Sequence, residues 1–167
     1  MRCQTLAHSF ESEGHKCFFV CKEYPEQLHR IASPAFKIDV IPNDYGQIDD
    51  ALACAKVCRE NDISLIVVDN YGLDTEWESL VKDTAPILCI DDLANRKHNC
   101  RILIDSNFYH NADTRYQGLI PSDCRQLLGP RYALIRDEFY NSKKVSIPDS
   151  PQILHVFCFF GGTDPTG

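Results

Sequence analysis

Residues 64–74 read SLIVVDNYGLD, and this stretch decides the fold class of the chain. Its first half, Ser64 to Val68, is a short apolar run typical of a strand buried on both faces of a parallel sheet. Its second half is polar and ends at Asp74, directly before a segment with helical periodicity, where aspartate commonly caps a helix N-terminus. The stretch therefore predicts a strand, a turn and a helix in succession.

The same order of strand and helix is repeated on both sides of this stretch. Further strands are predicted at 16–21, 37–41, 86–90 and 102–104, and helices at 2–11, 25–32, 47–61, 75–82 and 134–140. The stretch between residues 107 and 121 is expected to be irregular. Apolar strands that alternate with amphipathic helices indicate a parallel sheet covered on both faces. We therefore expect an α/β fold with a Rossmann-like or flavodoxin-like sheet.

Two of the predicted helices carry local signals for their ends and faces. Gly14 follows the first helix in the way that a C-cap glycine would. The helix at 47–61 has an apolar face, expected to be buried, that comprises Ile48, Ala51, Leu52, Ala55 and Cys58. Both features favour helices that pack against the sheet.

A change in composition near residue 143 indicates a domain boundary. Residues 143–151 are rich in Lys, Ser and Pro, as linkers often are. Residues 152–167 contain another apolar run followed by paired glycines. We therefore expect a Rossmann-like N-terminal domain at 1–142, a linker at 143–151, and the first strand and glycine turn of a second domain at 152–167.

The composition excludes several classes of protein. The 167 residues are 44% hydrophobic and 25% charged, which is close to the globular average. A formal charge of −7, without a run of Lys or Arg, argues against a nucleic-acid partner. The apolar runs are far shorter than the roughly 20 residues that cross a bilayer, and the N-terminal segment lacks a signal-peptide pattern. We therefore expect a cytoplasmic protein without a membrane partner.

The nine cysteines and six histidines form no metal-binding pattern in the sequence. The cysteine count is odd and no CxxC pair occurs, so buried reduced thiols are the favoured interpretation. His98 and Cys100 have a spacing that could suit a metal, but no second pair of ligands completes a tetrahedral set. We therefore predict no metal and no cofactor, and we interpret the histidines as structural or surface residues.

Ligands of open α/β sheets bind beyond the carboxyl ends of the strands, so the residues that follow each strand are candidate site residues. Asp69 and Tyr71 follow the strand at 64–68 and offer a carboxylate and a phenol to a polar ligand. These two side chains are expected to face the crevice, whereas Asp74 is explained by its role as a helix cap.

A second cluster follows the strand at 86–90 and contains Asp91, Asp92 and Arg96. The two aspartates could together hold Mg²⁺. Alternatively, the arginine and the carboxylates could form a structural ion pair and a helix cap, which is the favoured interpretation. Asp92 and Arg96 are retained as candidate ligand contacts.

Two more clusters precede or follow tight turns. Tyr132 and Arg136 follow the turn at Gly129, and arginine suits bidentate contact with phosphate, although Arg136 could equally pair with Asp137 or Glu138. Gly161, Gly162 and Thr163 follow the apolar run at 153–160, where backbone N–H groups could approach a diphosphate. A simple turn is the alternative interpretation of the glycines, because neither GxGxxG nor GxxxxGK[ST] is present.

Five ordered motifs together resemble the family of UDP-sugar hydrolases of pseudaminic acid biosynthesis. They cover nearly the whole chain and read MRCxxLA at 1–7, VDNYGLD at 68–74, IDDLANR at 90–96, LGPxYALxRxEF at 128–139 and FGGTDP at 160–165. The resemblance implies a two-domain glycosyltransferase-B fold, similar to MurG, with UDP held mainly by the C-terminal domain. It also implies removal of UDP from UDP-2,4-diacetamido-2,4,6-trideoxy-β-L-altropyranose by attack of water at the anomeric carbon.

The resemblance also assigns expected roles to particular residues. The cleft side chains would be Arg2, Asp69, Tyr71, Asp92, Arg96, Tyr132 and Arg136, and the diphosphate would lie near Gly161, Gly162 and Thr163. In the family a first strand and a glycine-rich loop with the catalytic histidine precede the MRC motif. We therefore expect this strand and base to lie before Met1, most of the UDP-binding domain to lie after Gly167, and the fragment to be inactive.

Two other functions remain compatible with the same residues. A glycosyltransferase of the same fold would pass the sugar to an acceptor instead of water. A non-catalytic module of flavodoxin or receiver type would use Asp91 and Asp92 to bind Mg²⁺.

Overall fold

The computed structural model describes residues 2–22 and 36–140. The predicted helix at 25–32, the linker at 143–151 and the strand at 153–160 lie outside the described residues. The glycine turn at 161–163 lies outside them as well.

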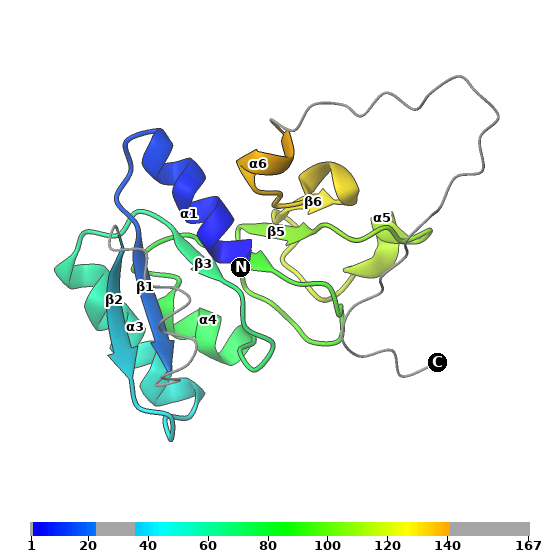
Figure 1. Ribbon diagram of the computed structural model, residues 1–167. Helices are drawn as coiled ribbons and strands as arrows, with labels where there is room; N and C mark the ends of the chain where they lie inside the picture. Colours follow the sequence, from blue (N-terminus) through cyan, green and yellow to red (C-terminus); the bar gives the residue numbers. More distant parts are fainter. Residues whose placement is uncertain (1, 23–35, 141–167) are drawn as a thin grey trace, which may run out of the picture.

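The described strands form two parallel sheets (Figure 1). The smaller sheet pairs β1 (Phe18–Lys22) with β2 (Lys37–Ile41). The larger sheet has the order β3 (Ile66–Val68), β4 (Ile87–Ile90), β5 (Ile102–Asp105) and β6 (Arg125–Leu128). Every pairing is parallel, so the predicted α/β class with a Rossmann-like sheet is confirmed.

The described helical segments are α1 (Arg2–Ser12), α3 (Gln47–Glu60), α4 (Thr75–Val81), α5 (Ala112–Arg115), the 3-10 turn η1 (Pro130–Tyr132) and α6 (Asp137–Tyr140). The Asp74 carboxylate accepts a 2.9 Å hydrogen bond from the backbone N–H of Glu76, which confirms it as the cap of α4. Gly14, just beyond α1, has a φ of +87°, a conformation that residues with a side chain rarely adopt.

Both faces of the larger sheet are covered. Ile87 and Cys89 of β4 belong to the core formed with α3 and α4. Leu88 and Ile90, which alternate with them, belong to a second cluster against which Cys3 of α1 packs. Because successive side chains of a strand point to opposite faces, this division explains why the run at 86–90 is continuously apolar.

The buried face of α3 differs from the predicted one. Ile48 and Leu52 are 54% and 57% exposed, whereas Asp50 and Cys54 are buried. The cause is a 2.7 Å hydrogen bond from the indole Nε1 of Trp77 to the Asp50 carboxylate, which places a polar residue at the contact with α4. The predicted positions Ala51, Ala55 and Cys58 are buried, as expected.

The C-terminal part of the described chain also departs from prediction. The stretch at 107–121, expected to be irregular, contains α5, and β6 was not predicted at all. β6 lies at the end of the sheet order and its first two residues are exposed, so it lacks the apolar run that identified the other strands. The helix predicted at 134–140 is shortened to α6, because Leu134 packs against the sheet cluster before the helix begins.

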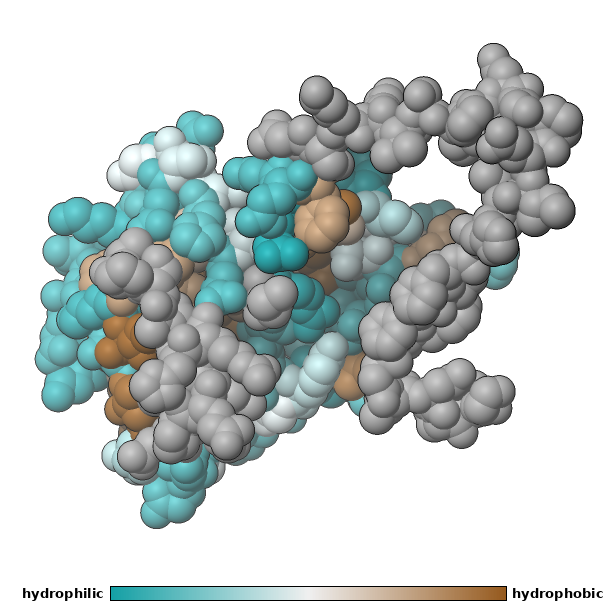
Figure 2. Space-filling model, in the orientation of Figure 1, coloured by the Kyte–Doolittle hydropathy of each residue, from teal (hydrophilic) through white to brown (hydrophobic). Residues whose placement is uncertain are grey.

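A cavity of about 1270 Å³ lies between the two sheets and is lined by residues of α1, β1, α3 and β3. Neither β1 nor β3 has a strand partner on its cavity side among the described residues. Figure 2 shows hydrophobic side chains at the surface over β2, where Val40 is exposed, beside the more hydrophilic surface of α1. Among the described helices, none has the length and apolar character needed to cross a membrane.

Candidate functional site

Acidic side chains lie in line at the carboxyl ends of three neighbouring strands. Asp69 follows β3, Asp91 and Asp92 follow β4, and Asp105 is the last residue of β5. The parallel order β3-β4-β5 brings these ends to one edge of the sheet, where ligands of α/β proteins bind. This edge is the candidate functional site.

Arg2, at the first turn of α1, connects two of these carboxylates. Its Nη2 lies 2.6 Å from Asp69 Oδ1 and its Nε lies 3.3 Å from Asp69 Oδ2, which is a bidentate contact. Its Nη1 lies 3.5 Å from Asp92 Oδ2. Burial alone would lower the pKa of Arg2, but hydrogen bonds to Asp69 and Tyr71 outweigh it and raise the pKa. Arg2 therefore stays charged and bridges the ends of β3 and β4.

Tyr71 closes this cluster from the loop after β3. Its hydroxyl donates a 2.7 Å hydrogen bond to Asp92 Oδ1, and Arg2 Nη2 lies 3.3 Å from the same hydroxyl oxygen. The hydrogen bond to Asp92 is the main reason that the pKa of Tyr71 is raised. Tyr71 is 49% exposed, so the phenol is a protonated donor beside open solvent.

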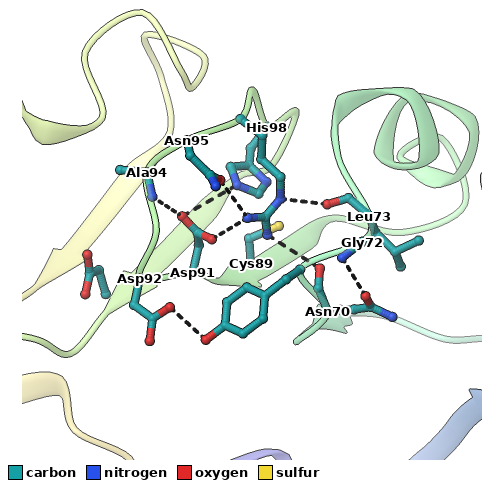
Figure 3. Close-up of polar contacts among 12 residues, drawn as sticks. Asn70, Gly72, Leu73, Cys89, Asp91, Asp92, Ala94, Asn95 and His98 are labelled. Atoms are coloured by element: carbon teal, nitrogen blue, oxygen red, sulfur yellow. Dashed lines mark hydrogen bonds and ion pairs between the residues drawn. The ribbon is translucent and has the colours of Figure 1, made fainter. Parts of the chain in front are cut away.

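Asp91 and Asp92 are adjacent in sequence but point in different directions (Figure 3). Asp91 is completely buried and accepts hydrogen bonds from the Ala94 N–H at 2.9 Å and from Arg96 Nη1 at 2.7 Å. Asp92 instead faces Arg2 and Tyr71. The alternative in which both aspartates hold one Mg²⁺ is therefore disfavoured by the geometry.

Arg96 uses its donors inside the protein. Besides its ion pair with Asp91, it donates from Nε to the Leu73 carbonyl at 2.9 Å and from Nη2 to the Asn70 carbonyl at 3.5 Å. The guanidinium also lies 5.8 Å from the centre of the Tyr71 ring. Arg96 thus holds the Asn70–Leu73 loop to the end of β4, and its assignment to a ligand stays a prediction.

A second arginine-centred cluster, missed in the sequence, lies beside Asp92. Arg115 of α5 donates from Nη2 to the Asp92 carbonyl at 2.6 Å and from Nε to Asp105 Oδ2 at 3.3 Å. Its guanidinium stacks 3.6 Å from the centre of the Tyr109 ring. Asn107 Nδ2 lies 3.4 Å from Asp92 Oδ2, on the exposed side. Asp105 directly after an apolar strand was the signal that could have identified this cluster.

Tyr116 is the buried member of this second cluster. Its hydroxyl lies 2.9 Å from Asp105 Oδ2 and 3.2 Å from Asp91 Oδ2, and the residue is completely buried. Burial and the hydrogen bond to Asp105 raise the pKa of Tyr116, so its single O–H stays protonated and lies within donating distance of both carboxylates. The ends of β4 and β5 are therefore connected in the protein interior by Tyr116 and nearer the surface by Arg115.

The remaining predicted residues are Tyr132 and Arg136, which lie within the described chain, and the glycine turn, which lies outside it. Tyr132 is half-buried and packs against the sheet cluster that contains Leu88 and Ile104. Arg136 pairs with Glu138 at 3.4 Å, as one of the two alternatives expected, and shares a cavity of about 250 Å³ with Arg2. Gly161, Gly162 and Thr163 lie outside the described residues, so their contact with a diphosphate stays a prediction.

These features define an α/β protein with a Rossmann-like parallel sheet and a polar cluster at the carboxyl edge of its strands. The chain is similar to the UDP-2,4-diacetamido-2,4,6-trideoxy-β-L-altropyranose hydrolase of Campylobacter jejuni, with 36% identity over 131 residues. The match covers 76% of this chain and 46% of that enzyme, so the chain spans about half the length of its relative. No protein-family profile matches the chain.

Proposed function

We propose that the chain forms the sugar-binding half of a hydrolase that removes UDP from UDP-2,4-diacetamido-2,4,6-trideoxy-β-L-altropyranose in pseudaminic acid biosynthesis. The similarity to the Campylobacter enzyme supports this function. The observation that carries the proposal is the cluster of Arg2, Asp69, Tyr71 and Asp92 at the ligand edge of the sheet. These residues lie within the sequence motifs at 1–7, 68–74 and 90–96 and would contact the substrate, in a cytoplasmic enzyme without a cofactor.

The charges at this edge favour the sugar over the diphosphate. Arg2, Arg96 and Arg115 each pair with a carboxylate, so their positive charge is largely neutralised within the protein. A diphosphate requires unpaired cations or free backbone N–H groups. Hydroxyl and acetamido groups of a sugar instead match the acceptors of Asp92 and the amide of Asn107. The diphosphate would then lie near Gly161–Thr163 and the UDP-binding domain.

The proposed enzyme has the two domains of a glycosyltransferase-B fold. Residues 1–142 would form the N-terminal domain, 143–151 the linker, and 152–167 the start of the UDP-binding domain. The cavity of about 1270 Å³ between β1 and β3 supports a further parallel strand at that position. In the family, such a strand precedes α1, so the chain would run from the strand through α1 to β1. Strands connected in this way are usually neighbours in a parallel sheet, which would place the strand beside β1. The catalytic histidine would lie in the loop between this strand and Arg2.

A chimeric enzyme tests the proposed function. Residues 2–140 of this chain would replace the matching segment of the Campylobacter hydrolase, which supplies the remaining parts. We expect the chimera to release UDP from the diacetamido UDP-sugar without an acceptor, and this chain alone to release none. Tyr71→Phe in the chimera is expected to lower kcat/KM, whereas Tyr45→Phe, outside the cluster, should leave it unchanged. A folded chimera that binds no UDP-sugar would refute the proposal.

The same chimera separates the hydrolase from a glycosyltransferase of the same fold. Release of UDP that depends strictly on an added sugar acceptor would favour the transferase. Tight binding of Mg²⁺ by this chain, measured by calorimetry and lost in an Asp92→Asn variant, would favour the receiver-like module. The engagement of Asp91 by Arg96 and of Asp92 by Arg2 argues against that module.

A further inference from the structure

A buried cluster of metal-binding residue types lies beneath the candidate site. Glu78 comes from α4, Cys89 from β4, and His98 from the segment between β4 and β5. Glu78 is 0% exposed and Cys89 is 1% exposed, while the His98 side chain is 1% exposed. One donor atom from each of the three side chains lies within 4.8 Å of the other two.

The donor atoms converge on one carboxylate oxygen. Glu78 Oε1 lies 2.7 Å from His98 Nδ1 and 2.9 Å from Cys89 Sγ. The second oxygen, Oε2, accepts a hydrogen bond from the backbone N–H of Asn99. Sulfur, imidazole nitrogen and carboxylate oxygen are the ligands of protein-bound zinc. The fold therefore supplies the partners for His98 that could not be identified from spacing alone.

The opposite ring nitrogen of His98 provides an independent observation. His98 Nε2 is buried and has no hydrogen-bond partner in the described part of the chain. Asp91 Oδ2 lies 3.9 Å from it. A histidine that ligates a metal through one nitrogen commonly donates its other N–H to a carboxylate. Metal coordination at Nδ1 would place an N–H on Nε2, directed at Asp91 (Figure 3).

Cys100 lies at the edge of the cluster, because its thiol is not within 4.8 Å of all three donor atoms and must rotate toward them to bind the same ion. Its thiol interacts with that of Cys89 and lies 3.7 Å from Cys124 Sγ. His98 and Cys100 both lie in the short segment between β4 and β5, so a rotation of the Cys100 side chain toward Glu78 and Cys89 would leave the sheet unchanged. With Cys100 rotated to join the three converging donors, four protein ligands of these types suit a closed tetrahedral site, which is the usual form of structural zinc.

We propose that Glu78, Cys89, His98 and Cys100 bind one zinc ion that fixes α4 to the β4–β5 part of the sheet. Binding forms two Zn–S, one Zn–N and one Zn–O bond. The thiol protons of Cys89 and Cys100 pass to solvent, and neutral His98 carries its remaining proton on Nε2, opposite Asp91. The ion replaces the hydrogen bonds that now converge on Glu78 Oε1 and leaves Asp91 outside its coordination sphere.

Hydrogen bonds alone could also hold this cluster together, and metal analysis distinguishes the two arrangements. The whole chain would be purified reduced, depleted with a chelator and titrated with Zn²⁺, then passed through a desalting column. We expect about one zinc per chain by elemental analysis and a higher melting temperature with zinc than with chelator. Absence of retained zinc together with an unchanged melting temperature would overturn the proposal.

Co²⁺ substitution tests the identity of the ligands. Co²⁺ bound by thiolates gives visible ligand-field bands and near-ultraviolet charge-transfer bands. Cys89→Ser and His98→Gln should abolish these bands, and Asp91→Asn should weaken affinity by about 10–100-fold, as outer-shell changes do. Cys54→Ser, which removes a buried thiol of α3, is the matched control and should keep full binding. Bands lost in Cys54→Ser but kept in Cys89→Ser would place the metal elsewhere and refute this site.

Folding and activity are kept separate in this test. Each variant would be compared by far-ultraviolet circular dichroism in the metal-free state, so that loss of binding is scored only in folded protein. Should Cys89→Ser fail to fold, Cys100→Ser removes the other thiolate and is expected to lower thiolate-to-cobalt charge transfer by at least half. No step requires hydrolysis of a UDP-sugar, so the zinc site and the proposed function can fail independently.

Discussion

Tyr71 and Asp92, 21 residues apart in sequence, are joined by a 2.7 Å hydrogen bond between the phenol and Oδ1. The bond connects the loop after β3 to the end of β4 at the surface of the candidate site. Arg2 lies against both side chains, so a residue of α1 completes the connection. The site is therefore assembled from three separate segments of the chain: α1 supplies Arg2, the segment after β3 supplies Asp69 and Tyr71, and the end of β4 supplies Asp92.

Arg2→Gln is predicted to destabilise the protein. The change removes the bidentate contact with Asp69 and leaves two carboxylates, Asp69 and Asp92, facing each other without a cation. Because these side chains are partly exposed, we expect a loss of about 1–2 kcal/mol in the free energy of unfolding, measured with urea. Arg101→Gln is the control, since its pair with Asp123 is exposed and should contribute about 0.5 kcal/mol or less. Equal effects for both variants would contradict a structural role for Arg2.

Asp74→Ala is predicted to weaken the start of α4. The Asp74 carboxylate satisfies the backbone N–H of Glu76, which has no partner within the helix. Loss of this cap should cost about 1 kcal/mol, whereas Asp74→Ser, which keeps an oxygen acceptor, should cost only a few tenths. Thermal unfolding followed by circular dichroism measures both. A larger loss for serine than for alanine would show that capping is not the role of this residue.

The buried hydrogen bond between Asp50 and Trp77 gives a third prediction. Asp50→Ala would leave the indole N–H unpaired between α3 and α4, at a cost of about 1–3 kcal/mol. Trp77 is the chain's single tryptophan, so its fluorescence reports this contact directly during unfolding. Asp49→Ala is the neighbouring control, because that residue is exposed at the start of α3, where its interaction with the helix dipole is worth about 0.5 kcal/mol. An unchanged emission maximum in folded Asp50→Ala would argue against the contact.

Local sequence patterns predicted most of the strands because the larger sheet is covered on both faces. Leu88 and Ile90 face one cluster while Ile87 and Cys89 face the other, so the whole run must be apolar. The same reasoning failed for β6, where the edge position removes the need for an apolar run. It also failed for the face of α3, because the pairing of Asp50 with Trp77 depends on a residue that lies 27 positions away.

The candidate site was predicted in outline but not in its internal contacts. Asp69, Tyr71 and Asp92 were identified because each follows a strand, and the parallel topology brings them to one edge. The roles of Asp105 and Arg115 depend on cross-strand distances, which spacing along the chain does not encode. The same limit applied to His98, whose partner Glu78 is 20 residues away on α4.

The Asp91 carboxylate predicts a specific dependence of stability on pH. Burial would raise the pKa of Asp91, but the Ala94 N–H, Arg96 and His98 together outweigh it and hold the pKa below its ordinary value. A carboxyl group with a lowered folded pKa stabilises the fold fully above its unfolded pKa of about 3.9. This contribution is lost as the pH falls through the lower folded pKa.

Asp91→Asn isolates that contribution from those of the other carboxylates. At neutral pH the variant leaves Arg96 without its buried partner, and we expect a loss of about 3 kcal/mol in the free energy of unfolding. Below about pH 4 the wild-type protein loses the same interaction, so the difference between the two proteins should shrink. Urea unfolding of both proteins between neutral pH and about pH 3 measures this difference. A difference that stays constant or widens as the pH falls would show that Asp91 is not ionised in the folded protein.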